Sequence, residues 1–241
     1  MSAPKAVMFW SGGKDSSLAL DRIRRGGEFD VTALITTVNP EFGRVSMHGV
    51  REALVVRQAE AADLPLVRME VPAASTNAAY VASLQSVLEA QRRAGVEAVI
   101  FGDIFLEDLR AWREGFLAQA GLKGVFPLWG GDTRALAGEF VERGFEGVVC
   151  CVDDARLDEQ SLGRALDVAF FAELPAGVDP CGENGEYHSF VASGPIFRCS
   201  VRWRAGERVY RPLAAGAPAA PAASAGSTTR GFWFLDLLPE A

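Results

Sequence analysis

Short apolar runs alternate with amphipathic segments along the first 174 residues. Five runs have the length of buried strands, namely residues 6–10, 31–37, 66–70, 98–102 and 147–152. Six segments carry apolar residues at helical spacing, namely residues 14–25, 51–62, 77–94, 106–120, 132–143 and 162–171. Strands that are apolar throughout and separated by helices are typical of a parallel sheet covered on both faces. We therefore expect a doubly wound α/β domain over residues 1–174.

The pattern changes after residue 174, where helical spacing stops and short alternating segments begin. Residues 187–191, 196–204, 207–212 and 232–237 predict antiparallel strands. We therefore expect a small, mostly β appendage over residues 175–241. Within it, residues 214–227 consist almost entirely of Ala, Gly, Pro and Ser, a composition that predicts a flexible loop.

The first predicted strand runs directly into Ser11-Gly12-Gly13-Lys14-Asp15-Ser16, which opens the first predicted helix. Two glycines allow a tight turn and a close approach of the backbone, and the N–H groups and dipole of a helix start favour an anion. A Walker A motif would require Gly in place of Met8 and Ser or Thr in place of Asp15, and no GxGxxG fingerprint is present. The segment predicts a phosphate loop of another class, with a plain capped helix start as the alternative.

This segment resembles the SGGxDS signature of the PP-loop, or N-type, ATP pyrophosphatase superfamily. The resemblance implies an adenine nucleotide alpha hydrolase-like sheet that binds ATP, cleaves it between the α and β phosphates and releases pyrophosphate. It assigns Ser11, Gly12, Gly13, Asp15 and Ser16 to the pyrophosphate end, with Asp15 on Mg²⁺ and Lys14 neutralising the charge that develops.

Three further residues near the carboxyl ends of predicted strands are assigned to the nucleotide site: Thr36, Gly102 and Asp103. The alternative for Gly102 and Asp103 is a plain turn from strand to helix, with Asp103 near the helix start.

A second polar cluster, Gly182-Glu183-Asn184-Gly185-Glu186-Tyr187-His188, follows Asp179-Pro180-Cys181. The residues alone leave two interpretations open, because Asn184-Gly185 is also a favoured two-residue hairpin turn between exposed strand ends. A zinc deaminase is excluded, since Asn184 stands where its second Cys belongs and no Glu follows His48 or His188 at the required spacing.

The cluster resembles the GENGE(F/Y)H motif of the diphthine–ammonia ligase family, a group within the same superfamily. Other segments resemble that family in the same order over residues 4–200, namely Met47-His48, Phe101-Gly102-Asp103-Ile104, Pro127-Leu128-Trp129-Gly130, Gly144-Phe145-Glu146 and Leu162-Gly163-Arg164. The segment at residues 105–110 departs from the Ser and Tyr that usually follow Gly-Asp-Ile, which leaves the identity of the acceptor open.

The family resemblance implies an ATP-dependent C–N ligase, in which a carboxylate attacks the α-phosphorus and ammonia then displaces AMP. It assigns catalytic roles to Lys14, Glu183, Glu186 and His188. It assigns substrate binding to His48, Asn184 and Gly185, although His48 on the sequence alone is equally well an ordinary turn residue. The expected partners are ATP, ammonia and a carboxylate on a small molecule or a protein side chain.

Charge and cysteine content narrow the function classes. The chain has 24 Lys and Arg against 31 Asp and Glu, a net charge of -7 that disfavours broad nucleic-acid binding. Its four cysteines form no CxxC pair, so we expect reduced, mostly buried thiols.

No apolar run has the length of a membrane span or of a signal-peptide core, which predicts a cytoplasmic protein without a membrane partner. The oligomeric state is left open, a homodimer included.

Two other functions are compatible with a PP-loop. An ATP-dependent tRNA-modifying enzyme would need a catalytic Cys pair and a basic face. A non-catalytic adenine-nucleotide-binding protein would leave the cluster from Glu183 to His188 without a role. The ligase is therefore the main hypothesis.

Overall fold

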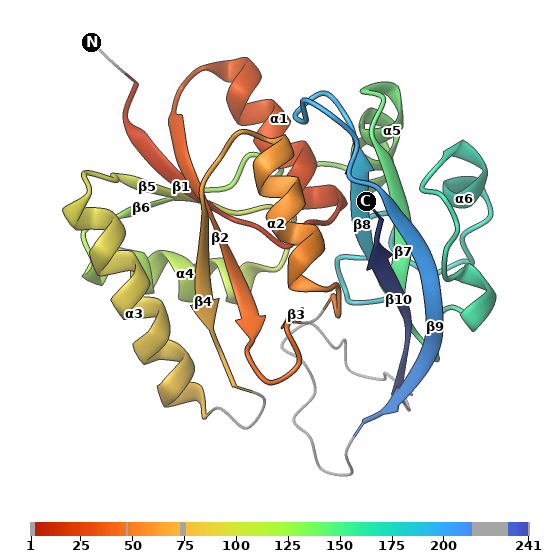
Figure 1. Cartoon of the computed structure of the whole chain (residues 1–241). Coiled ribbons are helices and arrows are strands. Elements are labelled where there is room, and N and C mark those ends of the chain that lie inside the picture. Colours follow the sequence, from red (N-terminus) through yellow and green to blue (C-terminus); the bar gives the residue numbers. More distant parts are fainter. Residues whose placement is uncertain (1–2, 47, 73–75, 214–230, 241) are drawn as a thin grey trace.

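The structure is a computed structural model that describes residues 3–46, 48–72, 76–213 and 231–240 (Figure 1). It contains a mostly parallel sheet and a separate antiparallel sheet, with two helices packed between them. The α/β class and the mostly β appendage are thus confirmed.

The parallel sheet has the order β3-β2-β1-β5-β6, with β4 also paired to β2. Its strands are β1 (Lys5–Phe9), β2 (Asp30–Asn39), β3 (Arg44–Val45), β4 (Leu66–Glu70), β5 (Ala98–Ile100) and β6 (Lys123–Val125). The two-residue strand β3 runs antiparallel to its neighbour, whereas β1, β2, β4, β5 and β6 pair in parallel. The carboxyl ends of β1 and β5, which are adjacent strands, therefore lie at one edge of the sheet.

Helices cover both faces of this sheet. Successive side chains of a strand point to opposite faces, so neighbouring residues of β1 contact different helices. Ala6 and Met8 of β1 pack with helices α1 (Lys14–Gly26) and α2 (Glu52–Ala61). Val7 of β1 packs with α3 (Asn77–Arg93) and α4 (Glu107–Gln119) on the other face. The doubly wound arrangement follows directly from this alternation.

The antiparallel sheet has the order β8-β7-β10-β9. Its strands are β7 (Glu146–Asp153), β8 (Tyr187–Ser193), β9 (Trp203–Pro212) and β10 (Gly231–Pro239), and α5 (Thr133–Glu142) precedes it. Helix α1 contacts β8 and α2 contacts β10, so one continuous core joins both sheets through these helices (Figure 1). This arrangement brings β8 next to the start of α1.

Several expected elements differ from the structure. The run at residues 147–152 is a buried strand, but it is β7 of the antiparallel sheet and not part of the parallel one. An apolar run predicts burial of a strand and does not fix its direction. The predicted helix at residues 162–171 is reduced to α6 (Val168–Ala172), preceded by a 3-10 turn at Glu159–Ser161. Residues 196–202 are irregular, and β9 begins only at Trp203.

Along the chain, β6 is the last strand of the parallel sheet and β7 is the first strand of the antiparallel sheet. The expected domain boundary at residue 174 stays a prediction. The predicted loop at residues 214–227 lies outside the described residues. Three of the four cysteines, Cys150, Cys151 and Cys181, are buried, as expected, and Cys199 is exposed. Among the described helices, none is both long and apolar enough to span a membrane.

Candidate functional site

The phosphate loop, residues 11–16, connects β1 to α1 at the carboxyl edge of the parallel sheet. Gly12 has φ of 78°, a left-handed conformation in which glycine is favoured. Gly13 stands at the cap of α1, and its carbonyl accepts hydrogen bonds from the Ser16 and Ser17 hydroxyls at 3.0 and 2.9 Å. The Gly13 N–H donates to Ser11 Oγ at 3.2 Å. The predicted strand, loop and helix are therefore present, with backbone N–H groups gathered at the helix start.

Strand β8 of the antiparallel sheet lies directly against this loop. The backbone N–H of Lys14 donates to Ser189 Oγ at 3.0 Å, and the Val191 N–H donates to the Gly12 carbonyl at 2.9 Å. From α2, the Gln58 amide donates to the same Gly12 carbonyl at 2.9 Å. No sequence pattern indicated Gln58 or Ser189, because each reaches the loop only through the packing of distant elements.

The Lys14 side chain is turned inward, with 1% of its surface exposed, and forms an ion pair with Asp15. Burial lowers the pKa of Lys14, but the Asp15 carboxylate and other nearby groups together more than offset this, so the pKa lies well above its ordinary value. Cys181 and Tyr187 are also close enough to raise the pKa of Lys14. Lys14 is therefore a protonated cation held between the loop and the second polar cluster.

That second cluster is a compact loop, residues 179–186, that leads into β8. Glu186 is 2% exposed, and its carboxylate accepts the N–H groups of Asp179 and Asn184 at 3.0 and 3.1 Å and the Asn184 side-chain amide at 3.0 Å. No described strand lies between α6 and β8, and Asn184 does not have the positive φ that a type I′ turn requires. The hairpin interpretation is therefore wrong, and a buried carboxylate organises the loop instead.

Glu183 of this loop reaches the turn after β5, where its Oε1 accepts the Ile104 N–H at 2.8 Å. Burial and the nearby Asp15 charge raise the pKa of Glu183 to about 8. In the same turn, a Cβ atom on Gly102 would lie 3.0 Å from the Asp15 carbonyl carbon and the Ser16 nitrogen, so a larger residue would require the backbone of the phosphate loop to shift. The phosphate loop, the turn after β5 and the 179–186 loop thus meet at one place.

Asp103, next in that turn, forms an ion pair with Arg113 of α4, with Nε and Oδ2 2.9 Å apart. Burial raises the pKa of Asp103, while the Arg113 charge opposes this effect. Asp103 is also close enough to raise the pKa of Glu183.

The rings of His48 and His188 lie against each other beside the loop, with centroids 4.6 Å apart and their planes tilted by 33°. The Nδ1 atom of His48 lies 3.1 Å from the Ser189 carbonyl oxygen, an acceptor that selects the tautomer protonated on Nδ1. Burial lowers the pKa of both rings, and that of His188 falls to about 3. Both imidazoles are therefore neutral near pH 7, and Nε2 of His48 carries a lone pair.

Three of the expected residues have different surroundings. The Asn184 amide turns back to Glu186, and Gly185 closes a turn by donating to the Gly182 carbonyl at 3.0 Å. Thr36 is fully buried in β2, and within the described part of the chain its hydroxyl has no hydrogen-bond partner. A buried hydroxyl without a partner is costly. Met47 lies outside the described residues.

The residues at the loop suit Mg²⁺ only in part. No group of three or more His, Cys, Asp or Glu among the described residues could hold a metal ion by itself. Mg²⁺ on nucleotides is usually held by one or two carboxylates together with phosphate oxygens, and Asp15 and Asp103 are carboxylates beside the loop.

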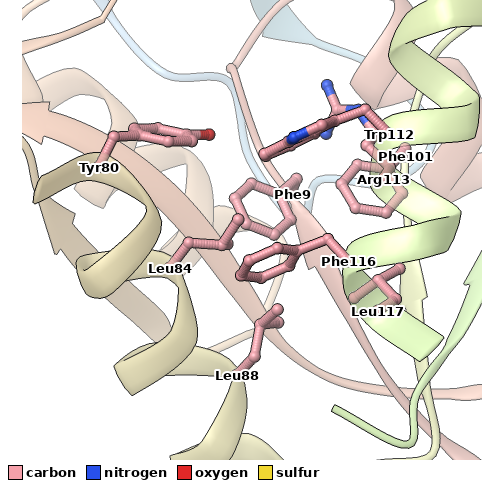
Figure 2. Close-up of a pocket in the computed structure, with 9 residues that line it drawn as sticks. All are labelled: Phe9, Tyr80, Leu84, Leu88, Phe101, Trp112, Arg113, Phe116 and Leu117. Atoms are coloured by element: carbon pink, nitrogen blue, oxygen red, sulfur yellow. The ribbon is translucent and has the colours of Figure 1, made fainter. Parts of the chain in front are cut away.

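A ring-lined pocket adjoins this edge of the sheet on the α3 and α4 side (Figure 2). Phe9, at the end of β1, and Phe101, after β5, line it from the sheet, while Tyr80 and Trp112 face it from the two helices. The ring centroids of Tyr80 and Trp112 are 6.4 Å apart, and the Arg113 guanidinium lies 4.2 Å above the Phe101 ring.

Comparison with known families gives two matches in tandem. Residues 4–124 match the model of the diphthamide synthase N-terminal domain, and residues 132–214 match that of the diphthamide synthase C-terminal domain. The boundary between the matches falls between β6 and α5.

Several proteins named diphthine–ammonia ligase are similar along most of the chain. The zebrafish protein is 28% identical over 235 residues, which are 89% of this chain and 92% of that protein. The human protein is 26% identical over 231 residues, 87% of this chain and 86% of that protein. The fission yeast protein is 27% identical over 214 residues, but the chain spans only 35% of its length.

Proposed function

The chain belongs to the diphthamide synthase family, and on this basis we propose that it is an ATP-dependent C–N ligase that amidates a carboxylate with ammonia. A carboxylate oxygen attacks the α-phosphorus of ATP, and pyrophosphate leaves. Ammonia then attacks the acyl carbon, loses a proton and displaces AMP. The observation that carries this proposal is the meeting of the phosphate loop with Glu183 and the His48–His188 pair at one edge of the sheet.

The phosphate loop supplies the donors for the pyrophosphate end of ATP. The N–H groups of Asp15 and Ser16 have no acceptor within α1, where the helix dipole favours an anion, whereas those of Gly13 and Lys14 donate to the Ser11 and Ser189 hydroxyls. Lys14 is a permanent positive charge at this end, and its role is to stabilise the charge of the departing pyrophosphate. Gly12 and Gly13 permit the close backbone approach, and the Ser11 and Ser16 hydroxyls add rotatable donors.

The loop at 179–186 and the histidine pair form the acceptor side. Glu183 is protonated near pH 7 and donates or accepts a hydrogen bond as the acceptor carboxylate binds. His48 is neutral and its Nε2 can accept the proton that ammonia loses, whereas a pKa of about 3 makes His188 a weak base that acts here by packing against His48. Glu186, Asn184 and Gly185 act on this side by shaping the loop.

Mg²⁺ is proposed at Asp15, with Asp103 as the second nearby carboxylate. When bound there, the metal neutralises phosphate charge and lowers the barrier to departure of pyrophosphate. We place the adenosine toward the ring faces of Phe9 and Trp112, on the α3 and α4 side of the sheet.

The acceptor is a carboxylate, and the names of the relatives make diphthine the first candidate to test. The experiment is to incubate the protein with Mg-ATP, ammonium and diphthine-bearing elongation factor, or other carboxylates, and to identify the nucleotide products. AMP and pyrophosphate formed only with ammonium support the ligase. ADP, or tight binding without turnover, would indicate a nucleotide-binding protein, and product from tRNA with a sulfur donor would indicate the tRNA-modifying enzyme.

A further inference from the structure

Gln58, in α2, is completely buried and makes hydrogen bonds to two residues of the connection between β1 and α1 and to one residue of β8. Its Oε1 accepts the indole N–H of Trp10 at 3.0 Å. Its Nε2 donates to the Gly12 carbonyl at 2.9 Å and to the Val191 carbonyl of β8 at 2.6 Å. We propose that Gln58 is a positioning residue that sets the phosphate loop for the pyrophosphate end of ATP, an inference that rests on the proposed function.

The orientation of the Gln58 amide is fixed by its partners. An indole N–H can only donate, and the two backbone carbonyls can only accept. The reverse orientation would therefore place the amide oxygen against two carbonyl oxygens and the amide nitrogen against an N–H. No apolar side chain of the same length could replace these bonds, because two buried carbonyls and one indole would be left with fewer partners.

The effect on the phosphate loop follows from the planarity of one peptide group. The Gly12 carbonyl and the Gly13 N–H belong to the same trans peptide and point in opposite directions. Gln58 and the Val191 N–H hold the Gly12 carbonyl from one side. The Gly13 N–H must then face the other side, where it meets the Ser11 hydroxyl at 3.2 Å. Gln58 thereby aims a backbone donor into the loop.

Gln58 also limits which residue can occupy position 12. A Cβ atom on Gly12 would lie 2.5 Å from Gln58 Oε1, far inside contact distance. The same side chain joins the loop to β8, the strand that carries His188 and Ser189. The loop and the acceptor side are therefore held in fixed relation through one buried amide.

Two substitutions, Gln58→Met and Gln58→Glu, remove different hydrogen bonds of the Gln58 amide. Methionine fills a similar volume without hydrogen bonds, whereas glutamate keeps an acceptor for Trp10 and loses the two donors when ionised. Protonated glutamate can donate one bond, and burial among carbonyls raises the pKa of a carboxyl group. The control is Asp236→Asn, which weakens another contact between the two sheets: Asp236 of β10 forms ion pairs with Arg44 and Arg51 at 2.9 and 2.7 Å.

The measurement is calorimetric binding of Mg-ATP, Mg-pyrophosphate and AMP to each folded variant. We expect Gln58→Met to bind Mg-ATP and pyrophosphate about tenfold more weakly and AMP within about twofold of the wild type. For Gln58→Glu the deficit in pyrophosphate binding relative to wild type grows between about pH 6 and 9, as the donor is lost. Asp236→Asn lowers the melting temperature and leaves the ratio of ATP to AMP affinity unchanged.

The inference is overturned if the Gln58 variants bind Mg-pyrophosphate as the wild type does, or lose AMP and ATP affinity equally. It is also overturned if Asp236→Asn produces the same selective loss. If Gln58→Met does not fold, the pH dependence of Gln58→Glu decides the question, since a purely structural role predicts a deficit that does not change with pH. A wild-type protein that binds neither Mg-ATP nor pyrophosphate contradicts the proposed function itself, an outcome distinct from all of these.

Discussion

The side chain of Glu183 accepts a hydrogen bond from the backbone N–H of Ile104, 2.8 Å away and 79 residues earlier in the chain. This contact closes the 179–186 loop onto the turn after β5, whose Gly102 lies against the phosphate loop. A carboxyl group is thereby kept next to the start of α1, in surroundings that favour its protonated form.

Stability should depend on the ionisation of Glu183. Its pKa is raised from 4.5 to about 8, so the folded protein holds this proton over a range in which the unfolded chain has lost it. The folded state therefore binds more protons between these values, and the free energy of unfolding falls as pH rises through that window. Glu183→Gln should flatten this dependence, as measured by urea unfolding at several pH values. A variant with the same pH slope as the wild type would show that the group is ionised in the folded protein.

Lys14 should be required for turnover. We expect Lys14→Ala to lower the rate of AMP and pyrophosphate formation by about 10²-fold or more, because the charge on the departing pyrophosphate loses its neutralising cation. Lys123→Ala, which removes an exposed lysine of β6, is the matched control and should retain the wild-type rate. Equal rates for the two variants would remove Lys14 from the mechanism.

Glu186→Gln tests the role of the buried carboxylate in the 179–186 loop. Glutamine cannot accept all three donors that meet Glu186, because one of its terminal atoms is itself a donor. We expect ATP binding to be retained and turnover to fall, since the loop shapes the acceptor side only. Titration with Mg-ATP and the assay for AMP measure the two effects. A parallel loss of both would instead assign Glu186 to folding.

The glycines of the site should not tolerate a methyl group. Gly102→Ala would push Cβ against backbone atoms of Asp15 and Ser16 at 3.0 Å, so we expect weaker Mg-ATP binding. Gly138→Ala is the control, because a Cβ atom on this helical glycine of α5 would meet nothing within 4 Å. It should be neutral or stabilise the protein by about 0.5–1 kcal/mol, as seen by thermal unfolding. Unchanged ATP affinity in Gly102→Ala would show that the turn can move away from the loop.

How much of this arrangement follows from the sequence depends on the distance between the partners along the chain. The phosphate loop is contiguous, and its strand, glycines and helix start are visible in residues 6–26. Gln58 and Ser189 reach the same loop from 46 and 175 residues away, so no local pattern could indicate them. Strand β6 is absent from the predicted elements for a different reason, because its three residues include an exposed lysine and a glycine.

The polar cluster at residues 179–188 shows the limit of local interpretation. Asn184-Gly185 matches a favoured hairpin turn, yet Glu186 captures the backbone of Asn184 and Asp179 and folds a loop in its place. Burial of the Glu186 side chain decides between the hairpin and the loop. A buried carboxylate must accept hydrogen bonds, and the nearest donors belong to its own loop.

The path of a single oxygen atom distinguishes attack on the α-phosphorus from attack on the γ-phosphorus. An acceptor whose carboxylate carries oxygen-18 is incubated with the enzyme, Mg-ATP and ammonium, and the nucleotide product is analysed by mass spectrometry. If the carboxylate attacks the α-phosphorus, one labelled oxygen leaves with AMP when ammonia displaces it. Unlabelled AMP, or label found in inorganic phosphate together with ADP, would contradict the account.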